Sequence, residues 1–572
     1  MNFLPWCVAV PFILAALLLA GASIVNRAIT TAIALTTAIA VVILCTLVLE
    51  QSLARGVLTY WFGGWHPGNH LGLGIAFEVE PFGAGLALIV AVLTAAALAY
   101  GYRSFDEVGV TFDVLVLVHL GAAIAFVYTS DLFDLIVFYE LTNVTEFALA
   151  GYKVGTPLAV RGAFNFAIAT GLGAFALIFG LTLLEGRTGG LNAAAIGESL
   201  MRAPSPVLAS CAFGLIVAGL LVKSALPPFH FWFVDAQTAA PTPVGVLFSG
   251  GVSVLGIYAL ERVWTTTFAH ALAPSAAVVH YSLAVLGMTG ACVAALLAFT
   301  AADLKRSLAF ATAAQMGIIV AAGTATDARS LAAAAFLVIG FAFPIAALAM
   351  WVGVLHHRLD TVIDEEYRGG GRGHRSSAVL ALLGIVGISG LPPVPTAFGR
   401  AMLPLPLAML SVLVGGVIAA RFALAAWRAY GERGSATKDA HDEEPNSWLL
   451  VLPGLVLGVC SFASGALPWA PFAAAAVAFV DPDTMSQALL HHVVRSPEAN
   501  VLPAPQSGRI VFLATATLVA TIVAVAILPA VRSFGVVRTL HGVHNGSVGD
   551  YVTWLLGGVA TITAVAVAVA AH

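Results

Sequence analysis

The sequence predicts an all-α polytopic membrane protein with about sixteen transmembrane helices. Of its 572 residues, 60% are hydrophobic and only 9% are charged. Apolar stretches of about 20 residues, the length that crosses a bilayer as a helix, recur from one end of the chain to the other. Short turns containing Gly or Pro join most of these stretches, as expected for neighbouring antiparallel helices.

Each apolar stretch is interpreted as one span, in chain order. The expected spans are 4–21, 28–49, 82–102, 111–129, 131–151, 162–186, 206–225, 242–262, 279–300, 306–323, 330–355, 377–395, 404–428, 447–468, 509–531 and 549–570. The polar stretches 51–80, 358–376 and 429–446 are expected loops, and 470–508 is a candidate interfacial helix. The first stretch lacks a basic leader and a small-residue cleavage site, so we expect it to be a retained span.

Lysine and arginine gather in alternate loops when the N-terminus is placed outside the membrane. Cytoplasmic loops carry this excess of positive charge in membrane proteins. The sequence therefore predicts a multi-pass protein of the bacterial plasma membrane with both termini extracytoplasmic.

Several function classes are disfavoured by composition. The net charge is −4 and there is no basic patch with interleaved aromatic residues, so no nucleic-acid partner is expected. All five cysteines lie in apolar stretches without a C-x-x-C pair, which favours packing over metal or disulfide chemistry. No dinucleotide fingerprint or haem-ligand arrangement is present, so we expect no cofactor and no redox centre in this chain.

Lys223, one of only four lysines, lies deep in an apolar run. An ammonium at the centre of a spanning helix costs about 2.5–3.5 kcal/mol on insertion scales, so it should face protein or water and have a partner. Pro227 and Pro228 follow within five residues and should break the helix. A broken helix at membrane depth is tolerated only in protein or beside a hydrated cavity, a pattern typical of ion pathways.

The expected counter-charge is Glu140, in the middle of span 131–151, with Asn143 one turn later on the same face. A Glu–Lys pair between two helices either relays protons or serves as a static packing contact, and the residues leave both interpretations open. Glu146 is expected to be interfacial, near the inner end of the span. Asp113 and His119, six residues apart in span 111–129, lie on different faces and are further candidates. His119 is expected to make a structural hydrogen bond, and an extension of the path is the alternative.

Five stretches of the chain resemble the proton-conducting membrane subunits shared by respiratory complex I, Mrp-type cation/proton antiporters, membrane-bound hydrogenases and inorganic-carbon uptake complexes. They are SDLFDLIVFYEL, VKSALPPFHFWFVDAQTAAPTPVG, GIYALER, ADLKRSLAFATAAQMGI and GISGLPPVPTAFGR. The resemblance implies two inverted five-helix repeats, each with one broken helix. The implied division is an N-terminal part at 1–105, repeats at 106–265 and 275–430, and a C-terminal extension at 445–572.

The resemblance also implies residue roles. Glu140 matches the family's essential glutamate and Lys223 matches its partner lysine. The second break falls at Pro392–Pro393, and Arg400 occupies the position where the family has a lysine or glutamate. Arginine stays protonated in proteins, so Arg400 can bias a carboxylate but cannot relay a proton. His230 and Asp235 are expected to cap and orient the first broken helix.

Four positions depart from the family pattern. Ser249 and Val254 replace a lysine or histidine after the first break, and Gly340 and Pro344 replace the central histidine and lysine of the second repeat. The hydrophilic axis across the membrane therefore lacks its titratable middle. Arg421 is a further intramembrane charge whose carboxylate partner the sequence does not identify.

The sequence favours a membrane subunit of a multi-subunit ion-translocating complex, with protons and a candidate sodium ion as its cargo. It would belong to a quinone-oxidoreductase-type translocase, an antiporter or a hydrogenase-like complex without a redox centre of its own. The alternatives are the membrane partner of an inorganic-carbon uptake complex and a non-conducting scaffold subunit. The 17 residues or so between the last two spans are too few for a long lateral helix.

Overall fold

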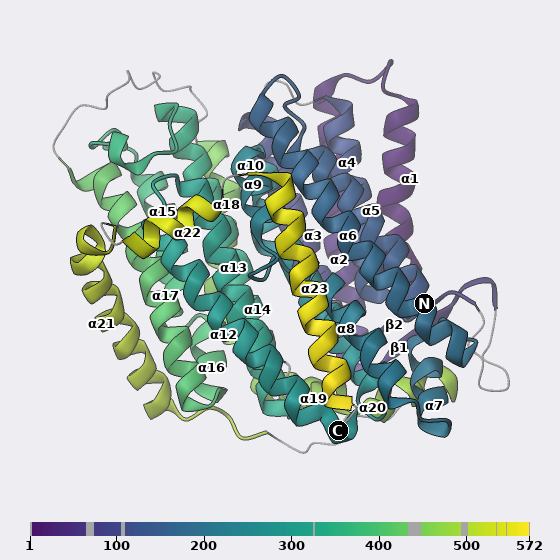
Figure 1. Cartoon of the computed structure of the whole chain (residues 1–572). Helices are drawn as coiled ribbons and strands as arrows, with labels where there is room; N and C mark the ends of the chain where they lie inside the picture. Colours follow the sequence, from purple (N-terminus) through teal and green to yellow (C-terminus); the bar gives the residue numbers. More distant parts are fainter. Residues whose placement is uncertain are drawn as a thin grey trace.

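Long apolar helices run side by side through the computed structural model of this chain (Figure 1). The structure describes residues 3–64, 74–104, 109–323, 327–432, 448–493, 502–532, 535–544 and 546–570. The predicted loop 429–446 lies mostly outside these described residues. This multi-pass, all-helical architecture confirms the predicted fold class at the level of helical membrane bundle.

Thirteen helices of the described residues are long and apolar enough to cross a membrane. They are α2 (Arg27–Arg55), α3 (Pro81–Ser104), α4 (Val110–Tyr128), α6 (Pro157–Thr188), α8 (Pro206–Lys223), α10 (Thr242–Leu247) continuous through a π-helical turn with α11 (Ser253–Val263), α12 (Ala276–Thr300), α13 (Leu304–Gly323), α14 (Ala328–Leu359), α17 (Leu405–Ala426), α18 (Trp448–Ala463), α21 (Ser507–Arg532) and α23 (Val548–Ala570).

Three further expected spans form helices that are either shorter than a typical membrane span or too charged to count as one. They are α1 (Leu4–Ala20), with 17 residues, α15 (Arg375–Ser389), with 15 residues, and α5 (Leu132–Ala150). Helix α5 has 19 residues but carries three carboxylates, Asp134, Glu140 and Glu146. These carboxylates lower the hydropathy of α5, and one of them, Glu140, is the expected partner of Lys223.

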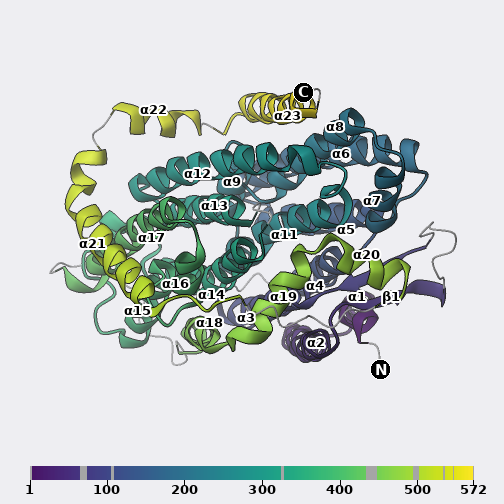
Figure 2. The same cartoon turned by 90° about the horizontal axis from the view of Figure 1, so that it is seen from below.

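Short elements fill the expected loops. The stretch 51–80 contains a two-stranded antiparallel sheet in which β1 (Leu58–Trp61) pairs with β2 (Ala76–Val79). The segment 470–508 contains two short helices, α19 (Trp469–Val480) and α20 (Pro482–Leu490), which lie with α7 (Ala193–Arg202) along one end of the bundle (Figures 1 and 2).

Two helices are interrupted at the paired prolines. Helix α8 ends at Lys223 and the chain becomes helical again in α9 (Phe231–Ala239), with Pro227 and Pro228 between them. Helix α15 ends at Ser389 and α16 (Pro395–Met402) follows Pro392 and Pro393. Proline lacks the backbone N–H that continues a helix, so both interruptions follow directly from the local sequence.

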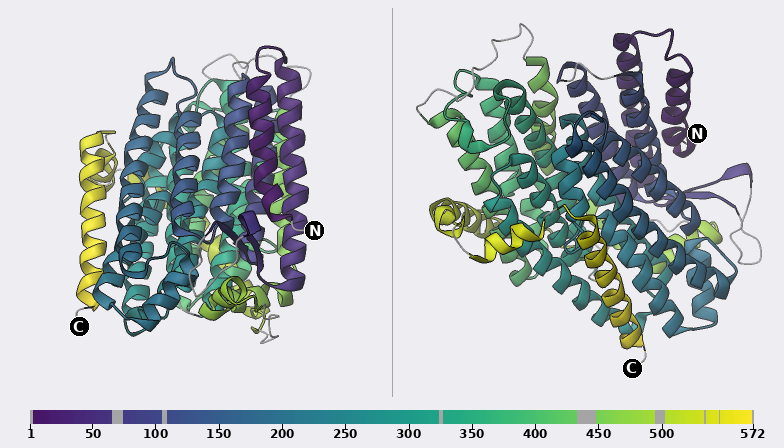
Figure 3. Two further views of the ribbon diagram at one scale, coloured as in Figure 1. Left: turned by 90° about the vertical axis from the view of Figure 1, so that its right-hand side faces the viewer. Right: turned by 45° about the horizontal axis from the view of Figure 1, so that its top comes forward.

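The last three helices form a C-terminal arm, α21 to α23. Helix α21 packs on α17, and α23 packs on α8. The short helix α22 (Gly535–Val543) lies between them and runs across the side of the bundle (Figures 1 and 3). A lateral helix is thus present, but it has only nine residues, in keeping with the short connection in the sequence.

Candidate functional site

Lys223 is fully buried at the end of α8, and its side chain meets one face of α5. Its Nζ donates to Oγ1 of Thr142 at 2.9 Å and to Oδ1 of Asn143 at 2.9 Å. The two carboxylate oxygens of Glu146 lie 2.9 Å and 2.8 Å from the same nitrogen. A buried ammonium is tolerated when it is paired and hydrogen-bonded, and these oxygens meet both conditions.

The carboxylate in contact with Lys223 is therefore Glu146. The expectation that Glu146 is interfacial was wrong, because its side chain is 0% exposed and ion-paired. Lys223 was expected to pair with Glu140, and in the structure it pairs with Glu146. Spacing could have pointed to Glu146, which is four residues after Thr142 and three after Asn143, so all three project from one helix face.

His119 on α4 lies beside this pair. Its Nδ1 is 3.7 Å from Oε1 of Glu146 and 3.3 Å from Oγ1 of Thr145. Asp113, near the start of the same helix, accepts a hydrogen bond from Thr31 of α2 at 2.9 Å. Six residues of helix separate Asp113 from His119 by about 9 Å, so a proton could pass between them only through intervening water.

Glu140 lies on another face of α5 and is half-buried. Val137 and Val144, three residues before it and four after it, are 44% and 45% exposed. Glu140 is thus a carboxylate on the apolar lateral surface of the described chain. Such a group requires a polar partner when it lies within a bilayer.

Arg400, on α16 after the second break, is buried and bound by neutral oxygens. It donates to the Ser389 carbonyl at 2.6 Å and to the hydroxyls of Ser411 and Thr517 at 3.0 Å and 3.2 Å. Among the described residues, all of its hydrogen-bond acceptors are therefore neutral oxygens. The second half of the chain therefore holds a fixed positive charge at its break.

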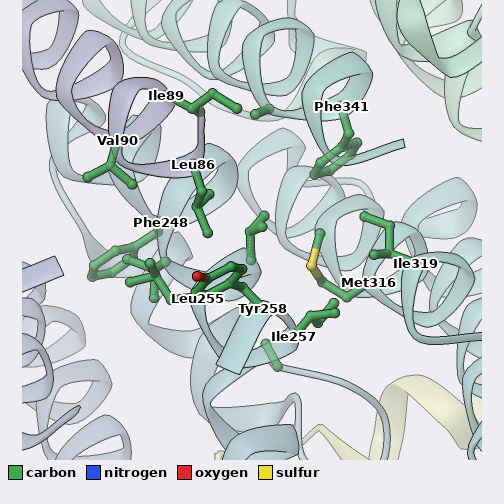
Figure 4. Close-up of a cluster of buried hydrophobic side chains, with 14 of the residues drawn as sticks. Leu86, Ile89, Val90, Phe248, Leu255, Ile257, Tyr258, Met316, Ile319 and Phe341 are labelled. Atoms are coloured by element: carbon green, nitrogen blue, oxygen red, sulfur yellow. The ribbon is translucent and has the colours of Figure 1, made fainter. Parts of the chain in front are cut away.

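An apolar cluster lies in the core of the bundle. Figure 4 shows side chains of α3, α11, α13 and α14, among them Leu86, Leu255, Met316 and Phe341, packed against one another. All four positions that depart from the family pattern are buried. Ser249 accepts a hydrogen bond from Gln237, Val254 is buried in the core, a Cβ on Gly340 would collide with Thr396, and Pro344 lies inside α14.

The partner of Arg421 is Asp364, in the loop after α14. Its Nη1 and Nη2 lie 3.0 Å and 2.9 Å from the two carboxylate oxygens of Asp364, and both side chains are 0% exposed. Arg428 also pairs with Asp364. These contacts hold the segment after α14 against α17 and against the π-helical turn that follows α17.

His230 and Asp235 do not cap the broken helix with their side chains, which corrects that expectation. Asp235 instead accepts a hydrogen bond from Asn165 of α6 at 2.7 Å. Nε2 of His230 lies 2.9 Å from Nε2 of His544, which follows α22. The C-terminal arm therefore reaches the first broken helix.

Comparison with known proteins agrees with this architecture. The chain is 31% identical over 285 residues to the NADH-quinone oxidoreductase subunit N of Desulforudis audaxviator, a match that covers 48% of this chain and 54% of that protein. It is 30% identical over 364 residues to a probable K(+)/H(+) antiporter subunit of Rhizobium meliloti, covering 62% of this chain and 35% of that protein. The chain thus spans about half or less of the length of these relatives.

Solved structures share the fold. A chain of the Mrp complex from Dietzia sp. DQ12-45-1b superposes with a TM-score of 0.75 at 20% identity, covering 85% of this chain and 99% of that one. A chain of the membrane-bound sulfane sulfur reductase, an archaeal respiratory membrane complex, gives a TM-score of 0.65 at 20% identity, covering 96% and 99%. Residues 129–423, which contain both broken helices and the Lys223–Glu146 pair, match the family described as NADH:quinone oxidoreductase/Mrp antiporter, TM. The protein is a multi-pass membrane member of this NADH:quinone oxidoreductase/Mrp antiporter family.

Proposed function

We propose that this protein is a proton-translocating subunit of a multi-subunit membrane complex, and that protons pass through the Lys223–Glu146 pair. The observation that carries the proposal is a fully buried amine and carboxylate 2.8 Å apart beside an interrupted helix. Buried ionisable pairs of this kind mark ion pathways in membrane proteins. Membership of the family and the names of its relatives support the same class of activity.

The proposed path begins at Asp113 and continues through His119 to Glu146. A proton that reaches Glu146 neutralises the carboxylate and removes the counter-charge of the Lys223 ammonium. An isolated buried ammonium is unfavourable, so Lys223 is then driven to release a proton of its own. Asn143 and Thr142 would hold the resulting neutral amine in place. Arg400 does not relay protons and would act only through its charge.

The finer architecture that we propose follows the family. It has sixteen crossings in all, including two inverted five-helix repeats at 106–265 and 275–430, flanked by 1–105 and 445–572. Both termini would then lie on the extracytoplasmic side of a bacterial plasma membrane. Glu140, on the lateral surface, would face another membrane subunit of the complex, which supplies its polar partner.

Proton uptake into inverted membrane vesicles of the native complex tests the proposal. We expect Lys223→Ala and Glu146→Gln each to abolish proton-coupled activity while the complex still assembles. Lys223→Arg keeps the charge but cannot release a proton at neutral pH, so it should be inactive as well. Glu50→Gln, at an exposed position on α2, is the matched control and should remain active.

A non-conducting scaffold is the second candidate, and the replacement of titratable residues by Ser249, Val254, Gly340 and Pro344 at buried positions favours it. In that case Lys223→Ala would impair assembly or stability, and Lys223→Arg would retain activity wherever the complex forms. The separate behaviour of the two variants distinguishes a relay from a packing contact.

A further inference from the structure

A second cluster of buried charges lies away from Lys223, where α11 meets β2. Arg262 donates to the backbone carbonyls of Val127 and Glu78, each at 2.7 Å, and to the Tyr258 hydroxyl at 3.2 Å. The Tyr258 hydroxyl donates to Oε1 of Glu80 at 2.6 Å, and the Gly83 amide donates to Oε2 of Glu80 at 2.7 Å. Both oxygens of Glu80 are therefore satisfied.

Glu78 is the exception in this cluster. Its side chain is 1% exposed, its Oε2 has only a 3.4 Å contact with Arg262, and its Oε1 has no hydrogen-bond partner among the described residues. A buried carboxylate oxygen without a partner is costly. Oε1 of Glu78 therefore indicates a ligand that the described residues do not supply.

The charge count leads to the same conclusion. The cluster holds two carboxylates, Glu78 and Glu80, against one guanidinium, Arg262, and each side chain is less than a tenth exposed. Asp131, also buried nearby, uses one oxygen to cap the first turn of α5. The ionised cluster therefore lacks at least one positive charge.

A cavity of about 20 Å³ adjoins this cluster. Its lining includes Glu78, Thr129, Ser130, Asp131, Tyr258 and Arg262. A cavity needs roughly 10–15 Å³ to hold one water-sized ligand, so there is room for one water molecule or one small dehydrated cation. Hydroxyl, carbonyl and carboxylate oxygens are the donors that hard cations prefer.

We propose that this cavity, the Glu78 cavity, binds one exchangeable monovalent positive charge, taken either as a proton on Glu78 or as an alkali-metal ion beside it. Either ligand satisfies the free oxygen and restores the missing charge. Burial raises the pKa of Glu78 to about 7, so a proton there would exchange near neutral pH. The charged groups that face it are Glu80, Arg262 and Asp131, and the titratable but neutral Tyr258 hydroxyl also lines the cavity.

One helix connects this cavity with the first site. Gly256 of α11 packs against the residues around Lys223, since a Cβ there would lie 2.6 Å from the Leu220 carbonyl and would collide with Ser224. Tyr258 and Arg262 follow on the same helix. The proposal does not depend on proton transport through Lys223, because it concerns a ligand at a separate cluster.

Thermal unfolding of the purified full chain tests the Glu78 cavity. The protein is heated in NaCl, KCl or choline chloride at equal ionic strength, at several values between pH 5 and pH 8. A higher melting temperature in NaCl or KCl than in choline chloride identifies an alkali-metal ion. A melting temperature that depends on pH but not on these salts identifies a proton.

Glu78→Gln removes the charge and should remove whichever response the unaltered protein shows, whereas Glu50→Gln should keep it. Identical responses of the unaltered protein and Glu78→Gln would overturn the proposal. If Glu78→Gln does not fold, calorimetric titration of the unaltered protein with NaCl and KCl decides, together with its proton uptake between pH 8 and pH 6. A saturable heat, or proton uptake that persists in Lys223→Ala and in His544→Ala, supports the site, and the lack of both overturns it.

Discussion

Nε2 of His544 lies 2.9 Å from Nε2 of His230, joining two residues that are 314 positions apart in the chain. One ring donates and the other accepts, so at least one of the two must be neutral for this contact to exist. At its other end, the same C-terminal arm places Thr517 of α21 at 3.2 Å from Arg400. The arm therefore contacts both broken helices.

We expect this contact to make the protein sensitive to acid. Burial lowers the pKa of His544 to about 4, below its ordinary value. The unfolded chain therefore takes up this proton at a higher pH than the folded one, and the folded protein loses stability as pH falls from about 6.5 to about 4. The loss should be at most roughly 3 kcal/mol. Melting temperatures of the unaltered protein and His544→Gln over this range check it, and equal slopes would contradict the assignment.

His119→Gln should lower proton uptake by at least about tenfold while leaving the melting temperature nearly unchanged, because a positioned proton carrier contributes roughly that much or more. His119 is positioned for this role because its Nδ1 lies 3.7 Å from Oε1 of Glu146. Vesicle assays of proton uptake provide the measurement. His357→Gln, at an exposed position, is the control, and equal uptake by both variants would remove His119 from the path.

Asp364→Asn should destabilise the protein by about 3–5 kcal/mol, because it leaves the Arg421 guanidinium buried without its carboxylate. Glu365→Gln is the neighbouring control. Its side chain is 56% exposed, so its removal should cost little. Denaturation of both variants in detergent gives the comparison, and similar stabilities would show that the Asp364 pair contributes nothing.

Gly317→Ala should cost about 1–3 kcal/mol through overpacking of the α12–α13 contact. The two helices cross at a pair of glycines, and a Cβ on Gly287 would lie only 2.5 Å from the Gly317 carbonyl. Gly186→Ala on α6 meets nothing within 4 Å and serves as the control. A melting temperature of Gly317→Ala equal to that of the control would mean that the crossing can spread apart without cost.

The amino-acid sequence by itself determined the helical, membrane-spanning class, because apolar length is a local property that the bilayer requires. It also placed the interruptions near Lys223 and Ser389, since proline ends a helix wherever it stands. The lysine in the first span indicated a buried site, because an ammonium there must have a partner.

Only the tertiary structure decided which carboxylate is the partner of Lys223. Glu140 and Glu146 lie on one helix six residues apart, and only the rotation of α5 against α8 turns Glu146 toward Lys223. The same holds for His230 with His544 and for Arg421 with Asp364, which are brought together by helix packing over long stretches of chain. Local spacing groups residues such as Thr142, Asn143 and Glu146 on one helix face, but it does not say which face meets Lys223. Hydropathy does not identify that face either, because each helix buries apolar residues on several faces within the bundle.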